Sequence, residues 1–432
     1  AQAVWAQGPS MPAARTDALA VDILILFASL HFVACQSAWP AVGQDGIEKP
    51  PAEDKPRAAK ASVSGCLAAW LPSCRWQAHQ LPALPAKASA LAREDWAALD
   101  PEIADLLGYL QSGLSSLGEV AHARDTFDRH LLGTFGILHA WDQPKYLCRF
   151  GLLHSVYSSE GFDYFMADVR RAESRQWVRE LIGTEAEELC YTFHLLDIAQ
   201  FTAAAKGVVS TLAASGLEVP TRALPGLRRT TLRLSASQVA DLLLMLAADV
   251  IEQETSVHGW MLNQEEFAPL LWPGESRPGT WMRTALEACR MAVRIGNLSS
   301  MGRLPTPLRL GAGYPASEAE AARRYADAAR LPSALPEAAR RRALLADMAA
   351  VRRFNRFAGE PLLLSAQVYA MDGAFAEAEK AAAAAIRIFS AWGTSWDRRH
   401  PLRQWLAMAR FLLHRVRRAR LSLPHALRDD RG

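Results

Sequence analysis

The sequence predicts an all-α protein, and three features of its pattern support this class. Half of the 432 residues are hydrophobic and only 22% are charged, so a sizeable core can form and global disorder is excluded. From Asp95 onward, apolar residues recur at helical spacing in long segments that short turn-forming stretches interrupt. Almost no segment alternates with the period of two over the length of a strand. Helices are therefore expected to build the fold.

The first 94 residues predict little compact structure. Residues 18–35 form the most apolar run, but Asp22 and His31 interrupt it, and a membrane-spanning helix needs ~20 apolar residues. We interpret this run as a buried or amphipathic helix, with an imperfect targeting or anchor segment as the alternative. Residues 40–60 are rich in proline, glycine and charge and predict a linker. A cytoplasmic location is favoured over a membrane location.

The helical periodicity allows the elements to be placed in order along the chain. We expect helices at about 100–118, 120–141, 144–156, 164–182, 184–204, 236–253, 281–296, 317–330, 336–357, 361–371, 374–390 and 398–418. Residues 207–235 contain Pro220 and Pro225 and predict an irregular excursion between helices. The resulting organisation has four parts. A poorly ordered N-terminal region covers 1–94 and is followed by a helical domain at 95–260. A connecting region at 261–316 leads to a second helical domain at 317–420.

Small residues and aromatics alternate near the C-terminus in a pattern typical of paired antiparallel helices. The pattern comprises Ala366, Tyr369, Gly373, Phe375, Ala378 and Ala385. It resembles a single tetratricopeptide repeat, in which small residues let two helices approach closely. Because one such unit cannot bury its own face, helices at 317–357 and 398–418 are expected to flank it. The resemblance implies a helical-repeat packing domain that can offer a face to a protein partner.

Composition and short motifs exclude several classes of function. The net charge is only +3, from 48 basic and 45 acidic residues, which argues against a nucleic-acid-binding surface. The six cysteines contain no C-x-x-C pair, which argues against a disulfide scaffold or a zinc ribbon. The motifs G-x-G-x-x-G, G-x-x-x-x-G-K-[ST] and G-x-S-x-G are all missing. Nucleotide-binding loops and the nucleophile elbow of α/β-hydrolases therefore lack support.

Two histidines occupy positions suited to metal binding. His130 lies beside a core-facing stripe of Phe127, Leu131 and Leu138, whereas His139, nine residues later, falls on the opposite helix face. His154 ends an apolar helix 24 residues after His130. Neutral imidazoles from two adjacent helices can bind a transition metal if carboxylates complete the shell. The spacing is equally compatible with two hydrogen-bonded core histidines.

Several acids are candidates for the remaining ligands or for a catalytic base. Asp249 lies on an apolar helix face, where an isolated carboxylate needs a partner. His194 and Asp197 are three residues apart on one predicted helix face. They form either a hydrogen bond between helices or a ligand pair. Glu160, six residues after His154, is a candidate base, ligand or cap.

These residues together resemble the HD-domain superfamily, and its guanosine tetra- and pentaphosphate hydrolases in particular. His130 and His154 match the two histidines of that motif, Asp249 matches the late aspartate, and Gln253 matches the following amide loosely. The segment HSVYSSEGF is closer still to an uncharacterised HD-like family with the signature HSVYGTE. The resemblance covers about residues 115–254 and implies an HD-like helical bundle. Ser155 departs from it, because HD proteins carry a metal-binding aspartate there.

The resemblance implies a metal-dependent hydrolase that acts on a small polar or phosphorylated metabolite, with iron-dependent oxidation as the alternative chemistry. A divalent transition metal (Mn, Fe or Zn) would be held by His130, His154 and Asp249. Glu160 would replace the lost carboxylate, or His194 or Asp197 would serve instead; the third alternative is that the metal is lost. Glu160 or Asp197 would accept a proton. An anionic substrate group would be bound by Arg149, Arg170 or Arg171.

A different class of function also fits the sequence. The replacement of the HD aspartate by Ser155 and the tetratricopeptide-like tail are both compatible with a non-catalytic protein. In that case the HD-like region would be a degenerate scaffold, and the C-terminal helices would bind a protein partner.

Overall fold

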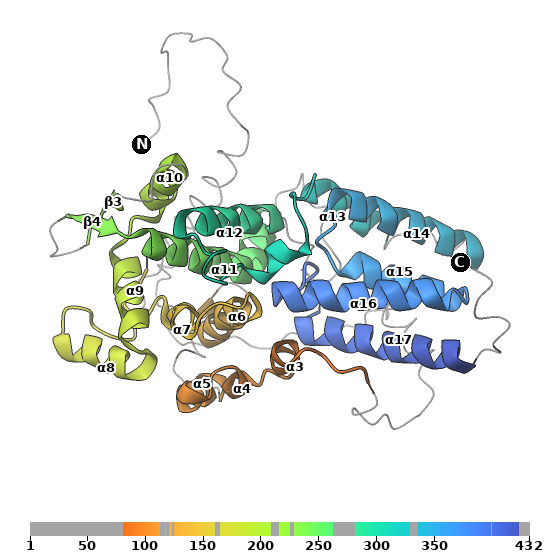
Figure 1. Ribbon diagram of the computed structural model, residues 1–432, viewed down its shortest axis with the longest axis horizontal. Helices are drawn as coiled ribbons and strands as arrows, with labels where there is room; N and C mark the ends of the chain where they lie inside the picture. The colour runs from red at the N-terminus through yellow and green to blue at the C-terminus, as the bar shows by residue number, and fades with distance from the viewer. Residues whose placement is uncertain are drawn as a thin grey trace, which may run out of the picture. The chain divides into compact units, whose positions relative to one another are not determined.

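The computed structural model (Figure 1) describes the chain from residue 81 to residue 422 with some gaps. The described residues are 81–112, 117, 121–122, 125–159, 165–208, 216–224, 229–261, 281–328, 336–398 and 400–422. The predicted apolar helix at 18–35 and the linker at 40–60 lie outside them. None of the helices that the structure describes has the length and apolar character needed to span a bilayer.

The all-α prediction is confirmed, and the described residues divide into two compact units. Among them, the first unit comprises 102–261 and 281–314, and the second comprises 81–101 and 315–422. Residues 281–314, which the sequence analysis expects as a connecting region, therefore belong to the first unit. The 3-10 turn η3 (Pro101–Ile103) lies where the chain passes from the second unit to the first.

The first unit is a helical bundle with two short hairpins. Its helices are α5 (Ala104–Gln111), α6 (Phe127–Ala140), α7 (Lys145–Leu153), α8 (Ala172–Ile182), α9 (Thr184–Leu195), α10 (Ile198–Val208), α11 (Ala236–Met261), α12 (Met282–Gly296) and the 3-10 helix η6 (Thr306–Leu310). Its antiparallel strand pairs are β1 (Ala121–His122) with β2 (Asp125–Thr126), and β3 (Leu217–Pro220) with β4 (Thr231–Leu234). Helix α11 packs against α6 and α7 on one side and against α12 on the other (Figure 1).

Several of the predicted helices differ from those in the structure, for local reasons. The helix expected at 164–182 begins only at Ala172, after a turn at 168–171. Within the helix expected at 120–141, residues 121–122 and 125–126 form the antiparallel strands β1 and β2, and α6 begins only at Phe127. The helix expected at 184–204 breaks in two at Leu196 and Asp197. The break follows from Asp197, whose carboxylate accepts the backbone N–H of Gln200 at 3.0 Å and so caps the start of α10. The excursion expected at 207–235 contains the β3–β4 hairpin.

A glycine lets α6 and α7 pack closely. The two helices are joined by a turn at Asp142, whose φ of 58° is tolerated by aspartate, and Pro144 precedes the first residue of α7. A Cβ atom on Gly151 of α7 would lie 2.5 Å from Leu138 Cδ1 of α6. Leu138 is fully buried, so its side chain can shift only by displacing neighbouring core side chains. The interface between α6 and α7 therefore requires glycine at position 151.

Replacing Gly151 with alanine is expected to lower the free energy of unfolding by about 1–3 kcal/mol, because the added methyl overpacks the α6–α7 interface. The matched control is Gly108→Ala in the exposed part of α5, where no atom lies within 4 Å of the added Cβ. That variant should be more stable by up to about 1 kcal/mol, since alanine favours the helix. Urea unfolding followed by circular dichroism measures both. Equal stability of the two variants would contradict this packing.

The second unit is built from consecutive helices that each pack against the next. These are α13 (Glu318–Ala328), α14 (Glu337–Phe354), α15 (Glu360–Met371), α16 (Phe375–Trp392) and α17 (Leu402–Ser422), with α3 (Ala86–Arg93) against α17 and the short α4 (Trp96–Leu99) beside α3. The alanines of the repeat-like pattern, Ala366, Ala378 and Ala385, are fully buried. Gly373 has a φ of 75° in the turn between α15 and α16, a conformation that favours glycine.

Candidate metal centre

His130, on α6, has both ring nitrogens engaged by carboxylates of α11. Its Nδ1 contacts the Glu252 carboxylate, and its Nε2 lies 3.2 Å from Asp249 Oδ1. The His130 side chain is only 2% exposed, so both contacts are shielded from water. An ionised carboxylate can only accept a hydrogen bond, so Nδ1 carries a proton and donates it to Glu252. Once the second proton has left the ring, as binding of a metal ion requires, the Nε2 lone pair is directed toward the same point as Asp249 Oδ1.

His154, at the C-terminal end of α7, is held by its own helix. Its Nδ1 donates to the carbonyl oxygen of Gly151 at 2.8 Å, which leaves the Nε2 lone pair free to accept. That Nε2 lies 3.5 Å from the Nε2 of His130 and 3.6 Å from Asp249 Oδ1. Three acceptor atoms, two from imidazoles and one from a carboxylate, therefore converge on one buried point.

The spacing of these three atoms fits a single transition-metal ion. In the part of the chain that the structure describes, His130, His154 and Asp249 form the one group of three potential donors within 4.8 Å of one another. The edges of their triangle measure 3.2, 3.5 and 3.6 Å. Donor atoms about 2.1 Å from a tetrahedral ion are separated by about 3.4 Å. Two imidazole nitrogens and one carboxylate oxygen are also ligands that Zn²⁺, Fe²⁺ and Mn²⁺ accept.

The electrostatics of the metal-free site place a proton on His130. Burial opposes the charged form, but the Glu252 and Asp249 carboxylates outweigh it and raise the pKa of His130 to about 9. Burial, together with the neighbouring charge of His130, lowers the pKa of His154, although Asp249 acts in the opposite sense. A cation is therefore already favoured at this point, and a metal ion would have to displace the extra proton of His130.

Residues 114–197 match the family model described as a domain of unknown function, DUF6817. This stretch is a DUF6817 domain. It contributes α6, α7 and therefore both histidines of the centre, whereas Asp249 and Glu252 lie beyond its end on α11. Comparison with curated proteins and with solved structures gives no match. The candidate centre is thus completed from outside the DUF6817 domain.

Glu252 is a site residue that the sequence analysis does not identify. It lies three residues after Asp249, hence on the same face of α11, and that spacing was the available signal. Its carboxylate fixes the tautomer of His130 in the DUF6817 domain. A Cβ atom on Gly133 would lie 2.7 Å from Glu252 Cγ, so α6 carries a glycine where Glu252 passes it.

Glu252→Gln is expected to weaken binding of Zn²⁺ by about 10–100-fold without removing any of the three donor atoms. The amide keeps the size of the side chain but supplies no negative charge to the His130 ring. Competition titration against a chromophoric chelator measures the change. An exposed acid on α9, Glu188, provides the control Glu188→Gln, which should bind Zn²⁺ like the parent protein. Unchanged affinity in Glu252→Gln would show that the carboxylate does not support the centre.

The other predicted ligands and bases of the DUF6817 domain lie elsewhere or outside the described residues. Glu160 lies outside them, so its role stays a prediction. Ser155 Oγ donates to Ser159 Oγ at 3.2 Å. His194 contacts Ser158 and Arg222 instead of the three donors. Asp197 caps α10, so the expected hydrogen bond between His194 and Asp197 is replaced by a helix break.

The arginines predicted to bind an anionic group form ion pairs with other acids. Arg149 Nη2 donates to Glu102 at 2.6 Å, and Arg170 and Arg171 both contact Asp168 at the surface. The structure therefore does not bring these three arginines to the His–Asp cluster. The bidentate pairing of Arg170 with one nearby carboxylate accounts for its position just before α8.

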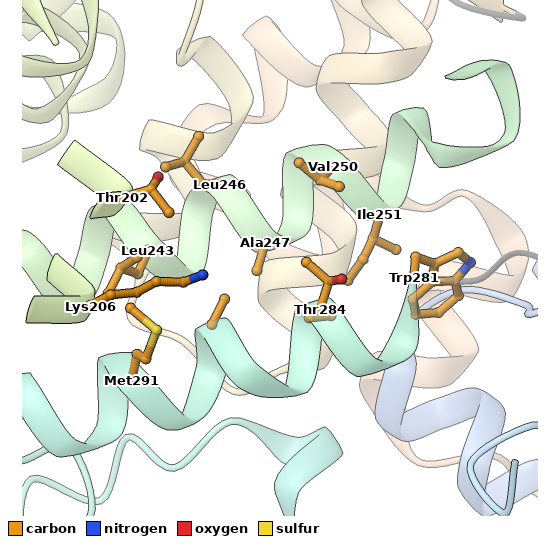
Figure 2. A pocket seen from close by; sticks show the side chains of 12 residues that line it. Thr202, Lys206, Leu243, Leu246, Ala247, Val250, Ile251, Trp281, Thr284 and Met291 are labelled. Carbon is orange, nitrogen blue, oxygen red and sulfur yellow. The ribbon is translucent and has the colours of Figure 1, made fainter. Parts of the chain in front are cut away.

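A small apolar cavity lies on the other side of α11. It occupies about 30 Å³ between α10, α11 and α12 and is lined mainly by hydrocarbon from residues such as Leu243, Ala247 and Met291. The Lys206 side chain extends along it toward Ala247 (Figure 2). Its volume accommodates one or two water molecules. It is too small for a metabolite and is lined by the face of α11 that packs on α12.

Proposed function

We propose that this protein is a metal-dependent hydrolase that acts on a small polar or phosphorylated metabolite. The observation that carries the proposal is the convergence of two imidazole Nε2 atoms and one carboxylate oxygen on a point of the right size for one ion. The resemblance of His130, His154 and Asp249 to the HD-domain motif supports the same assignment. The DUF6817 match adds the family but no activity.

The roles of the residues follow from their contacts. A bound divalent ion would lower the pKa of a water ligand toward ~7 and so supply a nucleophile for hydrolysis. Glu252 and the Gly151 carbonyl hold the two rings so that each Nε2 faces the same point. The burial of His130 and His154 excludes competing water from the donor atoms. Glu160 is the proposed proton acceptor.

A single ion rather than a pair fits the site. In HD proteins the aspartate after the second histidine contacts metal directly, and this chain has Ser155 at that position. The Ser155 hydroxyl is buried and directed to Ser159, at 3.2 Å. A neutral hydroxyl is a far weaker ligand than a carboxylate for bridging two cations. We therefore propose a mononuclear centre.

Reconstitution with single metals tests this function. The purified chain would be stripped with a chelator, reloaded with Mn²⁺, Fe²⁺ or Zn²⁺, and assayed for phosphate release from nucleotides and small phosphomonoesters. Metal-stimulated turnover that Asp249→Asn abolishes is the expected result. Oxygen consumption with Fe²⁺, without phosphate release, would instead favour the oxidation chemistry. Stoichiometric metal with no turnover of any kind would reject a catalytic function.

The second unit supports a different candidate function, the binding of a protein partner. Its consecutive helix pairs and the buried alanines of α15 and α16 resemble a tetratricopeptide repeat. A partner that binds the full chain and His154→Ala equally, but is lost when residues 317–418 are removed, would favour this function. A partner that depends on His154 would argue against it.

A further inference from the structure

Ser158 adopts a backbone conformation that serine rarely takes. It follows the turn after His154, and its φ is 74°, in the left-handed region where a side chain is strained and glycine is not. Strain of this kind persists where the surrounding structure holds the residue in place and often marks a site where a side chain is used. The hydroxyl of Ser158 is the only polar group that glycine would lack here.

That hydroxyl lies between a histidine and an arginine from distant segments. Ser158 Oγ is 3.3 Å from His194 Nδ1 at the C-terminal end of α9. Arg222, just after β3, extends Nη2 to within 3.1 Å of both the serine oxygen and the same ring nitrogen. Arg222 Nε also donates to the His194 carbonyl oxygen at 2.6 Å, which fixes the guanidinium beside the pair.

The arginine decides the tautomer of the imidazole. His194 Nδ1 has two neighbours of opposite kind: Arg222 Nη2, at 3.1 Å, only donates hydrogen bonds, whereas the Ser158 carbonyl oxygen, at 3.2 Å, only accepts them. The charged guanidinium makes the stronger hydrogen bond of the two, so Nδ1 is the unprotonated acceptor of the ring. Burial, with the positive charge of Arg222, lowers the pKa of His194 and keeps the ring neutral at pH 7. The serine O–H, whose oxygen is 3.3 Å from Nδ1, then shares this one acceptor with Arg222, and the two residues are placed as a nucleophile and its general base.

We propose that Ser158 and His194 form a second reactive site, separate from the metal centre, that cleaves esters or thioesters of small carboxylic acids. Ser158 Oγ forms a bond to the acyl carbon while its proton passes to His194 Nδ1. The C–O or C–S bond to the leaving group breaks, and the leaving group takes that proton. Water then hydrolyses the acyl-serine, releasing the acid and restoring the hydroxyl. Arg222 Nη2 lies where it would stabilise the oxyanion of the intermediate.

The absence of G-x-S-x-G from this chain does not conflict with the proposal. That motif specifies the strand-to-helix elbow of α/β-hydrolases, whereas serine–histidine pairs occur on unrelated folds in different chain orders. What the two arrangements share is a serine in a strained backbone conformation with its hydroxyl directed to a base. In this chain the strained residue follows a helical turn.

A fluorophosphonate probe tests the reactivity of Ser158 without knowledge of the substrate. Attack by Oγ forms an O–P bond, and the P–F bond breaks to release fluoride. We expect one phosphonyl group per chain, mapped to Ser158 by peptide mass spectrometry. Labelling should disappear in Ser158→Gly and slow by about 100-fold in His194→Gln, the order of a general-base contribution. It should persist in the presence of a metal chelator, which separates this site from the metal centre.

The variants also separate reactivity from folding. Ser158→Gly relieves the strained φ, so it should melt no lower than the parent protein while losing the label. Ser159→Ala alters the neighbouring buried serine and should label at the parental rate. No adduct on the parent protein, an adduct on another serine, or a labelling rate independent of His194 would each overturn the proposal.

Discussion

Replacing His154 with alanine is expected to weaken Zn²⁺ binding by about 100–1000-fold. Structural Zn²⁺ sites with four ligands bind with about 10–16 kcal/mol, or roughly 3–4 kcal/mol per ligand, and each 1.4 kcal/mol is tenfold in affinity. The same loss is expected for His130→Ala and Asp249→Asn, because the three donor atoms form one triangle with edges of 3.2 to 3.6 Å.

A buried histidine on α6, the helix of His130, provides the control for this series. His139 is 5% exposed and packs edge-on against Phe135, with ring centroids 4.4 Å apart, away from the three donors. His139→Gln should therefore bind Zn²⁺ as the parent protein does. Titration against a chromophoric chelator measures all four variants. Metal binding that survives in His130→Ala, His154→Ala and Asp249→Asn alike would remove the centre on which the proposed hydrolase depends.

The pH dependence of Zn²⁺ uptake follows from the same geometry. Because Glu252 and Asp249 raise the pKa of His130 to about 9 against the effect of burial, the metal-free ring is protonated at pH 7. Binding should then release a proton into the buffer, and the apparent affinity should rise as the pH increases toward 9. Titration in two buffers of different ionisation enthalpy detects this proton.

Glu360→Gln is expected to remove most of the pH dependence of stability in the second unit. Glu360, in the first turn of α15, is fully buried, and its Oε1 accepts the backbone N–H groups of Trp396 and Asp397 at 2.8 and 3.0 Å. Its Oε2 has no hydrogen-bond partner. Burial and the nearby Asp397 raise the pKa of Glu360 to about 8. The carboxyl is therefore protonated in the folded protein at neutral pH.

The sign of the effect follows from proton linkage. Between about pH 4.5 and pH 8 the folded state keeps a proton on Glu360 that the unfolded chain has released, so stability falls as the pH rises through this range. The difference between the pKa of Glu360 in the folded and in the unfolded state corresponds to a loss of roughly 3–5 kcal/mol in the free energy of unfolding across this pH range. Glutamine keeps the Oε1 acceptor and cannot ionise. Glu360→Gln should therefore lose no stability between about pH 4.5 and pH 8, and it should be more stable than the parent protein above pH 8.

Chemical unfolding at several pH values between 4.5 and 9 measures the prediction, with a probe in the second unit such as tryptophan fluorescence. The control is Glu377→Gln, an exposed acid in the first turn of α16, which should retain the parental pH profile. A Glu360→Gln profile parallel to that of the parent protein would show that Glu360 ionises normally in the folded state.

The sequence anticipates the helical class and the three residues that meet in the candidate centre, because both depend largely on local information. A period of 3.6 residues identifies helices such as α6, α7 and α11 from their own residues. The same period places His130 beside the apolar stripe of α6 and Asp249 on an apolar face of α11. A buried carboxylate needs a partner, so the pattern also indicates that Asp249 meets another polar group.

Prediction from local sequence failed where two local signals opposed each other and where a side chain found its partner elsewhere in the folded chain. The helix break at Leu196 and Asp197 depends on a capping aspartate within an otherwise continuous apolar period, and capping outweighed periodicity there. Arg149, Arg170 and Arg171 were predicted anion ligands by residue type alone. In the folded chain the nearest acids, Glu102 and Asp168, bind them.

By itself the sequence determined the all-α class, the apolar faces of the helices and the residue types available for a metal centre. Only the tertiary structure decided that Glu252 orients His130, a residue 122 positions away, and that Arg222 and His194 meet Ser158. The physical reason is that helical periodicity fixes the phase of each helix about its own axis. Which faces come into contact is decided by packing between distant segments, through close approaches such as those at Gly133 and Gly151.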